Sequence, residues 1–506
     1  MSWIPSSRGG TLWRALLGAV IVIGFTAATT AVAGLLEVNT FTHYLGFNPS
    51  IKNPGTVVPN PGHAQTILVV GSDHRAGTPF RSANTDTMML VRMDPSSSTI
   101  NVLSIPRDLK VELPGHGSSK INAAYQVGGP GLMVRVLKQQ VFPGLQINHI
   151  VDVNFGGFEA LVNAIGCVYT DVDHRYYNNT VYTGYSSIDL QPGYQRLCGA
   201  DALSFVRFRH TDSDLVRNAR QQDFIRWAKS QYSVSQLVAN RDKLVKIFGA
   251  HAQTDHNLHT TDGLLNLFNL VAFSAGHTIK QVKFPAILQP CGGGAVPAFG
   301  HTAVGVLPCY VTAQAGPLRA VFRQFMTPTK RGSSARKPGG GKAKASNPSK
   351  GAAVTADLAD GKSQAAALGA IGMPVYYPRV IASSSRYCTN ATCTIGPIAN
   401  SYPRAYQVRD QRKHLHTAYR MTLVINPLLG QYYGVQGTNW RNPPILNGSH
   451  QTRTVNGKRL QLFSNGGKLV LVAWRTGHGT YWISNTLTSD VSDSQMVAIA
   501  ASLTRG

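Results

Sequence analysis

Three short apolar runs constrain the fold more than any other feature of the chain. They cover residues 66–70, 88–93 and 100–105, and charged or polar residues follow each of them closely. A continuous apolar run of about four to eight residues is typical of a strand that is buried on both faces. Apolar residues at helical spacing follow at 131–141, 158–165 and 221–237. Strands that alternate with helices predict an α/β sandwich around a mixed or parallel sheet.

The longest apolar stretch lies near the N-terminus, at residues 12–36. About 20 such residues can cross a bilayer as a helix. Arg8 and Arg14 flank it without any acid, so the positive-inside rule keeps residues 1–11 in the cytoplasm. We therefore predict a single-pass anchor in the cell membrane, with the bulk of the chain outside the cytoplasm. A cleaved signal peptide is the alternative, because residues 31–33 form a tolerable cleavage pattern.

The cysteines agree with an exported protein. Outside the cytoplasm, an even number of cysteines predicts disulfides, and these six fall into three sequence-local pairs. The pairs are Cys167 with Cys198, Cys291 with Cys309, and Cys388 with Cys393. The sequence leaves the other connectivities open. A zinc site is disfavoured, because no CxxC spacing occurs and no cysteine has a histidine at finger spacing.

The charge balance indicates the kind of partner. The chain has 48 basic and 23 acidic residues, which give a formal net charge of +25. Such an excess favours polyanionic partners. For an exported chain these are anionic lipids, lipid pyrophosphates and phosphate-bearing wall polymers, and we expect no nucleic acid.

Composition divides the remaining chain into four parts. Residues 37–61 read as a stalk and residues 62–326 as the α/β domain. Residues 327–372 begin with a basic tract rich in Gly, Ser and Pro, which lacks large apolar residues and therefore predicts a disordered linker. Residues 373–506 are expected to form a small separate α+β domain.

Short alternating segments predict the strands of this last domain. Turn signals at Asn456-Gly457 and at 465–467 predict hairpins between the later ones. The expected strands are 419–425, 459–463, 468–474 and 480–483, and a helix at 494–503 closes the domain. Its many tyrosines and tryptophans are typical of a β core, and stacking on sugars is the alternative.

The charged residues of the α/β domain favour phosphoryl chemistry. Asp73, Asp86 and Arg107 stand at strand ends, where α/β folds line their ligand crevice. A second group gathers at 207–222, and its guanidinium forks suit phosphate oxygens. Solvated surface charge is the alternative for this group.

The sequence contains no P-loop after a strand, no GxSxG and no HExxH, which leaves Arg, Lys and Asp residues without an obvious nucleophile. Such a set suits phosphoryl transfer, because positioning and charge neutralisation supply most of its catalysis.

Five ordered motifs carry a resemblance to a known family. They are Gly71-Ser72-Asp73, residues 84–87, residues 104–108, residues 120–125, and the arginine-rich stretch that begins at Arg207. Over residues 62–326 the chain resembles the LytR-CpsA-Psr family. The resemblance implies an α/β/α sandwich with an apolar pocket for a prenyl tail and a charged mouth for a pyrophosphate. It also implies a membrane-anchored phosphotransferase that moves a glycopolymer from a polyprenyl-pyrophosphate carrier onto peptidoglycan.

The same resemblance implies roles for individual residues. Asp73 and Asp86 fall where the family holds Mg²⁺ (or Mn²⁺), and a turn cap is the alternative for Asp86. Asp108 is expected to orient Arg107. The residues that fall where the family grips the phosphates are Arg107, Lys120, Arg207, Arg209, Arg217 and Gln221. Among all of these, Arg107, Asp86 and Arg209 are expected to be catalytic.

The implied reaction is attack by a hydroxyl of the wall glycan, the muramic acid C6 hydroxyl, which leaves a phosphodiester. A non-catalytic wall-glycopolymer binding or regulatory protein and a polyprenyl-pyrophosphate pyrophosphatase remain alternatives. The basic composition, rich in Gly and Ala, leans toward an actinobacterial member, for which the polymer would be arabinogalactan or a teichoic-type glycan.

Two regions of the chain each allow two interpretations. Residues 166–195 form a Tyr- and Asn-rich insert between Cys167 and Cys198, which is either an acceptor-side loop or a long surface loop. The apolar stripes of 131–141 and 158–165 belong either to a lipid tunnel or to the core.

Overall fold

The protein is described from a computed structural model. The model describes residues 50–52, 54–72, 85–179, 187–208, 213–232, 241–274, 277–290, 308–329, 353–393 and 399–506. The expected membrane anchor lies outside these ranges. Among the residues inside them, no helix combines the length and the apolarity needed to cross a membrane.

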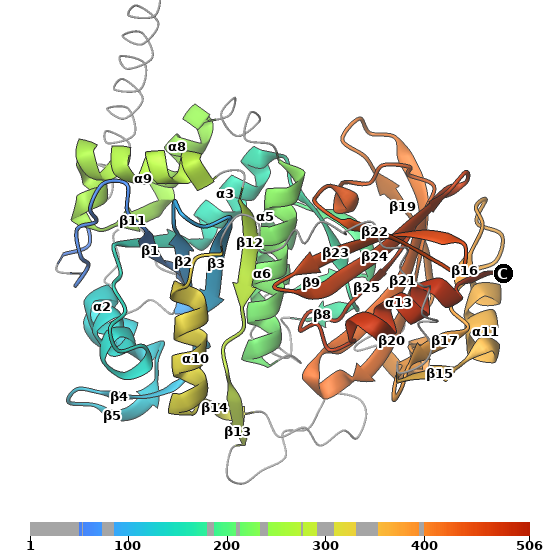
Figure 1. Ribbon diagram of the computed structural model, residues 1–506, viewed down its shortest axis with the longest axis horizontal. Helices are drawn as coiled ribbons and strands as arrows, with labels where there is room; N and C mark the ends of the chain where they lie inside the picture. Colours follow the sequence, from blue (N-terminus) through green and yellow to red (C-terminus); the bar gives the residue numbers. More distant parts are fainter. Residues whose placement is uncertain are drawn as a thin grey trace, which may run out of the picture.

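A mixed six-stranded sheet forms the centre of the first domain (Figure 1). Its order is β11-β6-β1-β2-β3-β12. The strands are β1 (Gln65–Ser72), β2 (Thr85–Met93), β3 (Thr99–Ser104), β6 (His149–Asn154), β11 (Ala252–Thr254) and β12 (Thr278–Val282). β1 pairs antiparallel with β2 and parallel with β6, and β12 pairs parallel with β3. The three apolar runs are therefore strands, as predicted.

Helices cover both faces of this sheet, because side chains alternate along each strand. Leu68 and Val70 of β1 belong to a core with α2 (Ala123–Val136) and α10 (Ala315–Met326). Ile67 and Val69 point to the other side and pack with α9 (Thr261–Ser274) and α8 (Arg241–His251). The predicted mixed α/β fold is confirmed.

The apolar stripe at 131–141 had two interpretations, a lipid tunnel and the core. Its residues Met133, Val134 and Leu137 pack in the core of the first domain.

The remaining elements of this domain are short hairpins and three further helices. The helices are α3 (Phe155–Ile165), α5 (Gly199–Arg207) and α6 (Asp214–Gln231), with the single turns η2 (Leu137–Val141) and η3 (His256–His259). The hairpins are β4 (Lys110–Leu113) with β5 (Gly117–Lys120), β7 (Val168–Val172) with β10 (Gly193–Leu197), β8 (Tyr176–Asn178) with β9 (Ile188–Leu190), and β13 (Ile287–Pro290) with β14 (Pro308–Thr312). The Tyr- and Asn-rich insert thus contains β7, β8, β9 and the first residues of β10.

An eight-stranded antiparallel sheet forms the second domain. Its strands are β18 (Arg386–Tyr387), β19 (Arg404–Arg409), β20 (Leu415–Asn426), β21 (Gln431–Thr438), β22 (Gln451–Val455), β23 (Lys458–Asn465), β24 (Lys468–Thr476) and β25 (Gly479–Ser484). Asn456 and Gly457 turn the β22–β23 hairpin with φ of 49° and 76°, the left-handed region that such a turn requires. The four predicted strands and the last helix, α13 (Asp493–Ser502), are present. Minor elements are β16 (Tyr376–Tyr377), α12 (Asn390–Cys393), η4 (Pro427–Leu429), η5 (Pro444–Leu446) and β26 (Thr504–Arg505).

The expected linker differs from the structure in its second half. Residues 327–372 were predicted to be disordered, but β15 (Val354–Ala356) and α11 (Leu358–Leu368) fold within this range. β15 pairs with β17 (Val380–Ala382), and α11 buries Ala365 and Leu368 in the core of the second domain. Alanine has the highest helix propensity, so an Ala-rich segment with a few well-spaced apolar residues can fold once a core accepts it.

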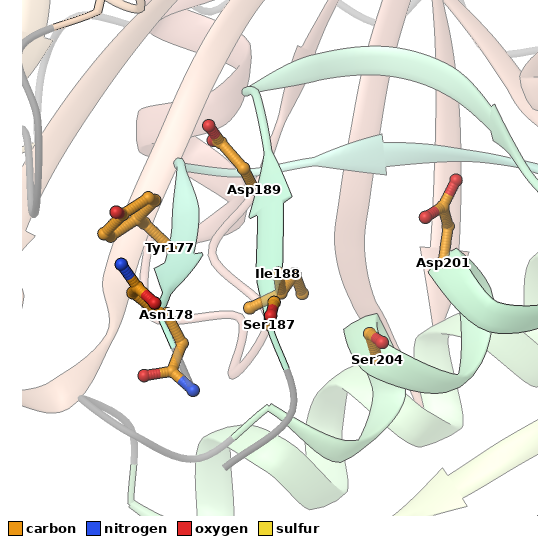
Figure 2. A pocket seen from close by; sticks show the side chains of 8 residues that line it. Tyr177, Asn178, Ser187, Ile188, Asp189, Asp201 and Ser204 are labelled. Carbon is orange, nitrogen blue, oxygen red and sulfur yellow. The ribbon is translucent and has the colours of Figure 1, made fainter. Parts of the chain in front are cut away.

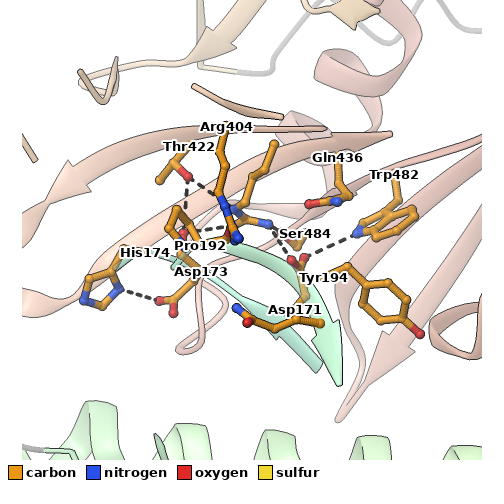
Figure 3. Close-up of polar contacts among 12 residues, drawn as sticks. Asp171, Asp173, His174, Pro192, Tyr194, Arg404, Thr422, Gln436, Trp482 and Ser484 are labelled. Atoms are coloured by element: carbon orange, nitrogen blue, oxygen red, sulfur yellow. Dashed lines mark hydrogen bonds and ion pairs between the residues drawn. The ribbon is translucent and has the colours of Figure 1, made fainter. Parts of the chain in front are cut away.

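The second domain is also not separate from the first. One apolar cluster combines residues of β7, β10, α5 and α6 with Val408, Ala418 and Trp482 of the second domain. Arg420 of β20 reaches across this boundary and forms an ion pair with Asp171 of β7, with 2.6 Å between Nη1 and Oδ1. Nε1 of Trp482 donates to the other oxygen of Asp171 at 3.3 Å (Figure 3). Most of the aromatic side chains that invited a carbohydrate interpretation lie in these cores, where Tyr433, Trp474 and Tyr481 are buried.

Candidate functional site

Asp86 is the centre of a charged cluster at the start of β2. Its Oδ1 accepts a hydrogen bond from Nη1 of Arg107 at 2.5 Å, and its Oδ2 accepts one from Nε of Arg207 at 3.2 Å. Arg107 follows β3 and Arg207 ends α5, so three separate segments of the chain meet at one carboxylate. All three residues were predicted site residues, and the structure brings them together.

The backbone of Arg107 is held from α6. Its amide donates to Oδ2 of Asp214 at 2.7 Å, and Asp214 is itself buried in an ion pair with Arg217. Nε of Arg107 is buried and makes no hydrogen bond to any residue that the structure describes. The ion-pair contact of this Nε with Oδ1 of Asp108 spans 3.9 Å, which is too long for a hydrogen bond. Sequence reasoning missed this role of Asp214, although an acid in the first helical turn was a visible signal.

Asp108 lies between two cations. Its Oδ1 is 3.0 Å from Nζ of Lys120 and 3.9 Å from Nε of Arg107. The closer contact is the one with Lys120, whereas the sequence predicted that Asp108 orients Arg107. Lys120 ends β5, so this carboxylate ties the β4–β5 hairpin to the loop that carries Arg107.

Arg217 and Gln221 lie behind the cluster. The two residues are 1% and 5% exposed. Nε2 of Gln221 donates to the carbonyl of Val206 at 3.1 Å, which fastens α6 to α5. Nε of Arg217 and Oε1 of Gln221 form no hydrogen bond within the described part of the chain. These two residues, which were predicted to bind phosphate, are therefore buried. Each has one polar atom without a hydrogen bond to a described residue.

Arg220 has a structural role. Its Nη1 donates to the carbonyls of Phe205 at 3.2 Å and Phe208 at 2.7 Å, and its Nε donates to the hydroxyl of Tyr176 at 3.1 Å. The side chain is fully buried. Arg220 therefore closes the C-terminal end of α5, which carries Arg207.

Phe155 orients Arg207. The guanidinium carbon of Arg207 lies 3.8 Å from the centroid of the Phe155 ring, which is a close cation–π contact. Phe155 begins α3, where the side chain of Asn154 accepts a hydrogen bond from the amide of Gly157 at 2.8 Å and fixes the first turn. Sequence reasoning missed Phe155, because nothing local connects it with an arginine about fifty positions away.

Asp152 lies in the central sheet, on β6. Oγ of Ser72 donates to its Oδ1 at 2.8 Å, and the hydroxyl of Tyr125 donates to its Oδ2. Ser72 and Tyr125 both belong to the sequence motifs. Asp152 was also missed, although a lone acid in an apolar strand was a usable signal.

Two predicted site residues, Asp73 and Arg209, lie outside the described residues. Ser72, the residue before Asp73, is the register partner of Thr85, the residue before Asp86. Among the described residues, no group of three or more His, Cys, Asp or Glu side chains is arranged to hold a metal ion.

Two of the three predicted disulfides are present in the structure. Cys167 pairs with Cys198, and Cys388 pairs with Cys393. The first joins the end of α3 to the start of α5, the helix that carries Arg207. The third predicted pair, Cys291 with Cys309, lies outside the side chains that the structure describes.

Comparison with known proteins places this site in context. The family model described as the LytR_cpsA_psr family matches residues 38–294. A protein of Oceanobacillus iheyensis named polyisoprenyl-teichoic acid–peptidoglycan teichoic acid transferase TagU is 34% identical over 210 residues, which are 40% of this chain and 62% of that protein. The probable cell wall biosynthesis protein LcpB of Corynebacterium glutamicum is 35% identical over 184 residues, which are 34% of this chain and 42% of that protein.

The chain therefore matches less than two thirds of the length of either relative. Among solved structures, the crystal structure of Bacillus subtilis TagV aligns with a TM-score of 0.39 at 24% identity, over 53% of this chain and 97% of that chain.

Proposed function

The chain belongs to the LytR_cpsA_psr family, and from this premise we propose that it is a phosphotransferase that moves a glycopolymer from a polyprenyl-pyrophosphate carrier onto peptidoglycan. The observation that carries the proposal is the convergence of Arg107 and Arg207 on Asp86. Guanidinium forks match the oxygens of a pyrophosphate in geometry and charge. The names of the relatives, which include a polyisoprenyl-teichoic acid–peptidoglycan teichoic acid transferase, support the same reaction class.

In this proposal a hydroxyl oxygen of the wall glycan, the muramic acid C6 hydroxyl, attacks the phosphorus that carries the glycopolymer. A phosphodiester bond forms, the bond to the bridging oxygen breaks, and polyprenyl phosphate leaves. Arg107 and Arg207 neutralise the charge that develops on the phosphate oxygens, and Lys120 and Arg209 complete the cationic set. The hydroxyl proton passes to Asp86 or to another nearby carboxylate.

We assign a Mg²⁺ or Mn²⁺ ion to Asp86 and Asp73. A carboxylate has about four lone-pair sites, and the two arginines use one at each oxygen of Asp86, so acceptor capacity remains. Oxygen ligands of this kind suit hard divalent cations. When bound, the ion would neutralise pyrophosphate charge and help to orient the reacting phosphate.

We also propose that residues 12–36 anchor the chain in the cell membrane and that the charged cluster around Asp86 lies outside the cytoplasm. The two disulfides support this location, because disulfides persist in oxidising compartments. The polymer would be arabinogalactan or a teichoic-type glycan.

The test uses the full chain in detergent, a prenyl-pyrophosphate-linked saccharide and a peptidoglycan oligomer, with and without Mg²⁺. We expect metal-dependent glycan linked through a phosphodiester, detected by mass spectrometry. Arg107→Ala is expected to lower this transfer at least about 100-fold, because the guanidinium acts on charge that develops in the transition state. Release of saccharide phosphate without acceptor modification would instead identify a pyrophosphatase, and binding without turnover a wall-binding protein.

A further inference from the structure

A hollow of about 290 Å³ with a mixed polar and apolar lining lies between the β8–β9 hairpin and α5 (Figure 2). Its volume is close to the lower end of the range of about 300–1,000 Å³ that is common for small-molecule sites. Tyr177, Asn178 and Asp189 line it from the hairpin, and Asp201 and Ser204 line it from α5. No residue of the reaction described above lines this hollow within the described part of the chain.

The lining chemistry suits a neutral ligand with many hydroxyls. Amides, carboxylates and a serine hydroxyl supply both donors and acceptors, and Tyr177 adds an aromatic ring. No Lys or Arg is among the described lining residues, although the chain carries a net charge of +25. A phosphate would meet the carboxylates of Asp189 and Asp201 here, and the guanidinium of Arg175 behind this wall is already bonded to both oxygens of Asp189. A sugar ring offers hydroxyls for the polar groups and a C–H face for the tyrosine.

The hairpin wall is held in place before any ligand arrives. Nε and Nη2 of the buried Arg175 donate to the two oxygens of Asp189, each at 2.8 Å, and the guanidinium lies 4.8 Å from the Tyr177 ring centroid. The second domain supports the same wall. The amide of Arg175 donates to the hydroxyl of Tyr402 at 2.7 Å, and Oγ of Ser401 donates to Gln191 at 2.5 Å. A wall fixed in this way loses little conformational freedom on binding.

The hollow adjoins the phosphate cluster through α5. Ser204 precedes Arg207 by three residues on this helix, so the two side chains are neighbours about one turn apart. Arg207 binds Asp86. A ligand in the hollow would therefore lie next to the group bound at the cluster.

We propose that this hollow binds a saccharide unit of one of the two glycans that the reaction joins. The choice of ligand rests on the proposed function, in which a phosphate stands between a donor glycan and an acceptor glycan. The shared chemistry is a neutral hexose or hexosamine ring. The donor and the acceptor are two possible sources, and they are separated by experiment.

The test variant is Asp201→Asn with Ser204→Ala in the full chain. Asp201 is exposed and Ser204 is small, so we expect both changes to leave the fold intact, as judged by thermal unfolding. The matched control is Asp360→Asn with Ser494→Ala, which changes an exposed first-turn acid of α11 and an exposed serine of α13, both in the second domain.

Binding is measured calorimetrically with three probes. They are a phosphate-free peptidoglycan tetrasaccharide, a short-chain prenyl pyrophosphate that carries the saccharide, and the same prenyl pyrophosphate without it. We expect the test variant to lose about tenfold in affinity for one of the first two probes, through lost hydrogen bonds, and to bind the third normally. Loss for the tetrasaccharide assigns the hollow to the acceptor, and loss for the sugar-bearing carrier alone assigns it to the donor.

Equal affinities of the test and control variants for all three probes would overturn the proposal. Failure of the proposed function would look different, because wild-type protein would then yield no transferred product while saccharide binding could still be measured. Weaker binding of the sugar-free carrier by the test variant would also count against the proposal, since it would place the effect at the phosphate cluster.

Discussion

A single carboxylate at Asp86 holds two guanidiniums that would otherwise repel each other. Removing its charge should therefore disturb the positions of Arg107 and Arg207 as well as any bound cation. We predict that Asp86→Asn lowers transfer at least about 100-fold while the thermal unfolding midpoint changes little.

Asp94, the residue that directly follows β2, provides the matched control for Asp86. Its ion pair with Arg92 spans 3.7 Å, and its side chain is 15% exposed against 14% for Asp86. Asp94→Asn should leave kcat/KM unchanged. Equal losses of activity in the two variants would show that a general effect on β2, and not the charged cluster, explains the result.

Asp173 makes stability depend on pH at the boundary between the domains. Burial raises its pKa, but the neighbouring His174, the Tyr176 hydroxyl and Arg220 together outweigh burial and leave the pKa lower than the ordinary value of 3.8. A carboxyl group with a lowered pKa in the folded state stabilises the fold above its unfolded pKa, and this contribution is lost as the pH falls through the folded pKa.

We predict that Asp173→Asn lowers the free energy of unfolding at pH 7, and that the difference from wild type shrinks below about pH 3.8. Urea unfolding at pH 7, 5 and 3 measures both proteins. A difference that stays constant across this range would mean that the carboxylate charge is not responsible.

At the scale of elements, the Cys167–Cys198 disulfide joins the end of α3 to the start of α5 across a sequence separation of 31 residues. We predict that replacing both cysteines with alanine destabilises the fold by about 2–4 kcal/mol, because the unfolded chain regains loop freedom. Without the disulfide, the start of α5 is held less firmly, and Arg207 at the end of this helix should be positioned less well. We therefore expect kcat/KM for transfer to fall.

The second disulfide is the natural control, since Cys388 and Cys393 are separated by only 5 residues. Its removal should cost about 1–2 kcal/mol less, because loop entropy grows with loop length. It should also leave kcat/KM unchanged. If the shorter loop proved the more costly to open, the entropic explanation would be wrong.

At the scale of the whole molecule, the two domains share one apolar cluster with a buried ion pair inside it. We predict that Arg420→Leu destabilises the protein by about 3–5 kcal/mol, because Asp171 is left buried without its cation. The double variant Asp171→Leu with Arg420→Leu should recover part of this loss.

Calorimetry of the wild-type chain should show one cooperative transition, since the apolar cluster that the two domains share couples the unfolding of one domain to that of the other. Two transitions, of which Arg420→Leu shifts only one, would contradict a shared core.

The residues of the candidate site differ in how far the sequence could predict them. Asp86, Arg107 and Arg207 could be named because their motifs are local. Phe155 and Asp152 could not, because their roles depend on contacts with Arg207 and with Ser72 and Tyr125 that only folding creates. Arg217 and Gln221 were predicted at the phosphates, yet their burial behind Asp214 depends on how α6 packs against α5.

The amino-acid sequence by itself determined the buried strands and the hairpin turns, because apolar periodicity and turn chemistry are local properties of the chain. It predicted, with other connectivities open, the two disulfide pairs that the structure contains, and its motif order carried the resemblance to the family. Only the tertiary structure decided that residues 353–368 fold, that the second domain shares an apolar cluster with the first, and that a hollow lies one helical turn from Arg207. Each of these depends on apolar surface and charge from distant segments, which gain their free energy only when the segments meet.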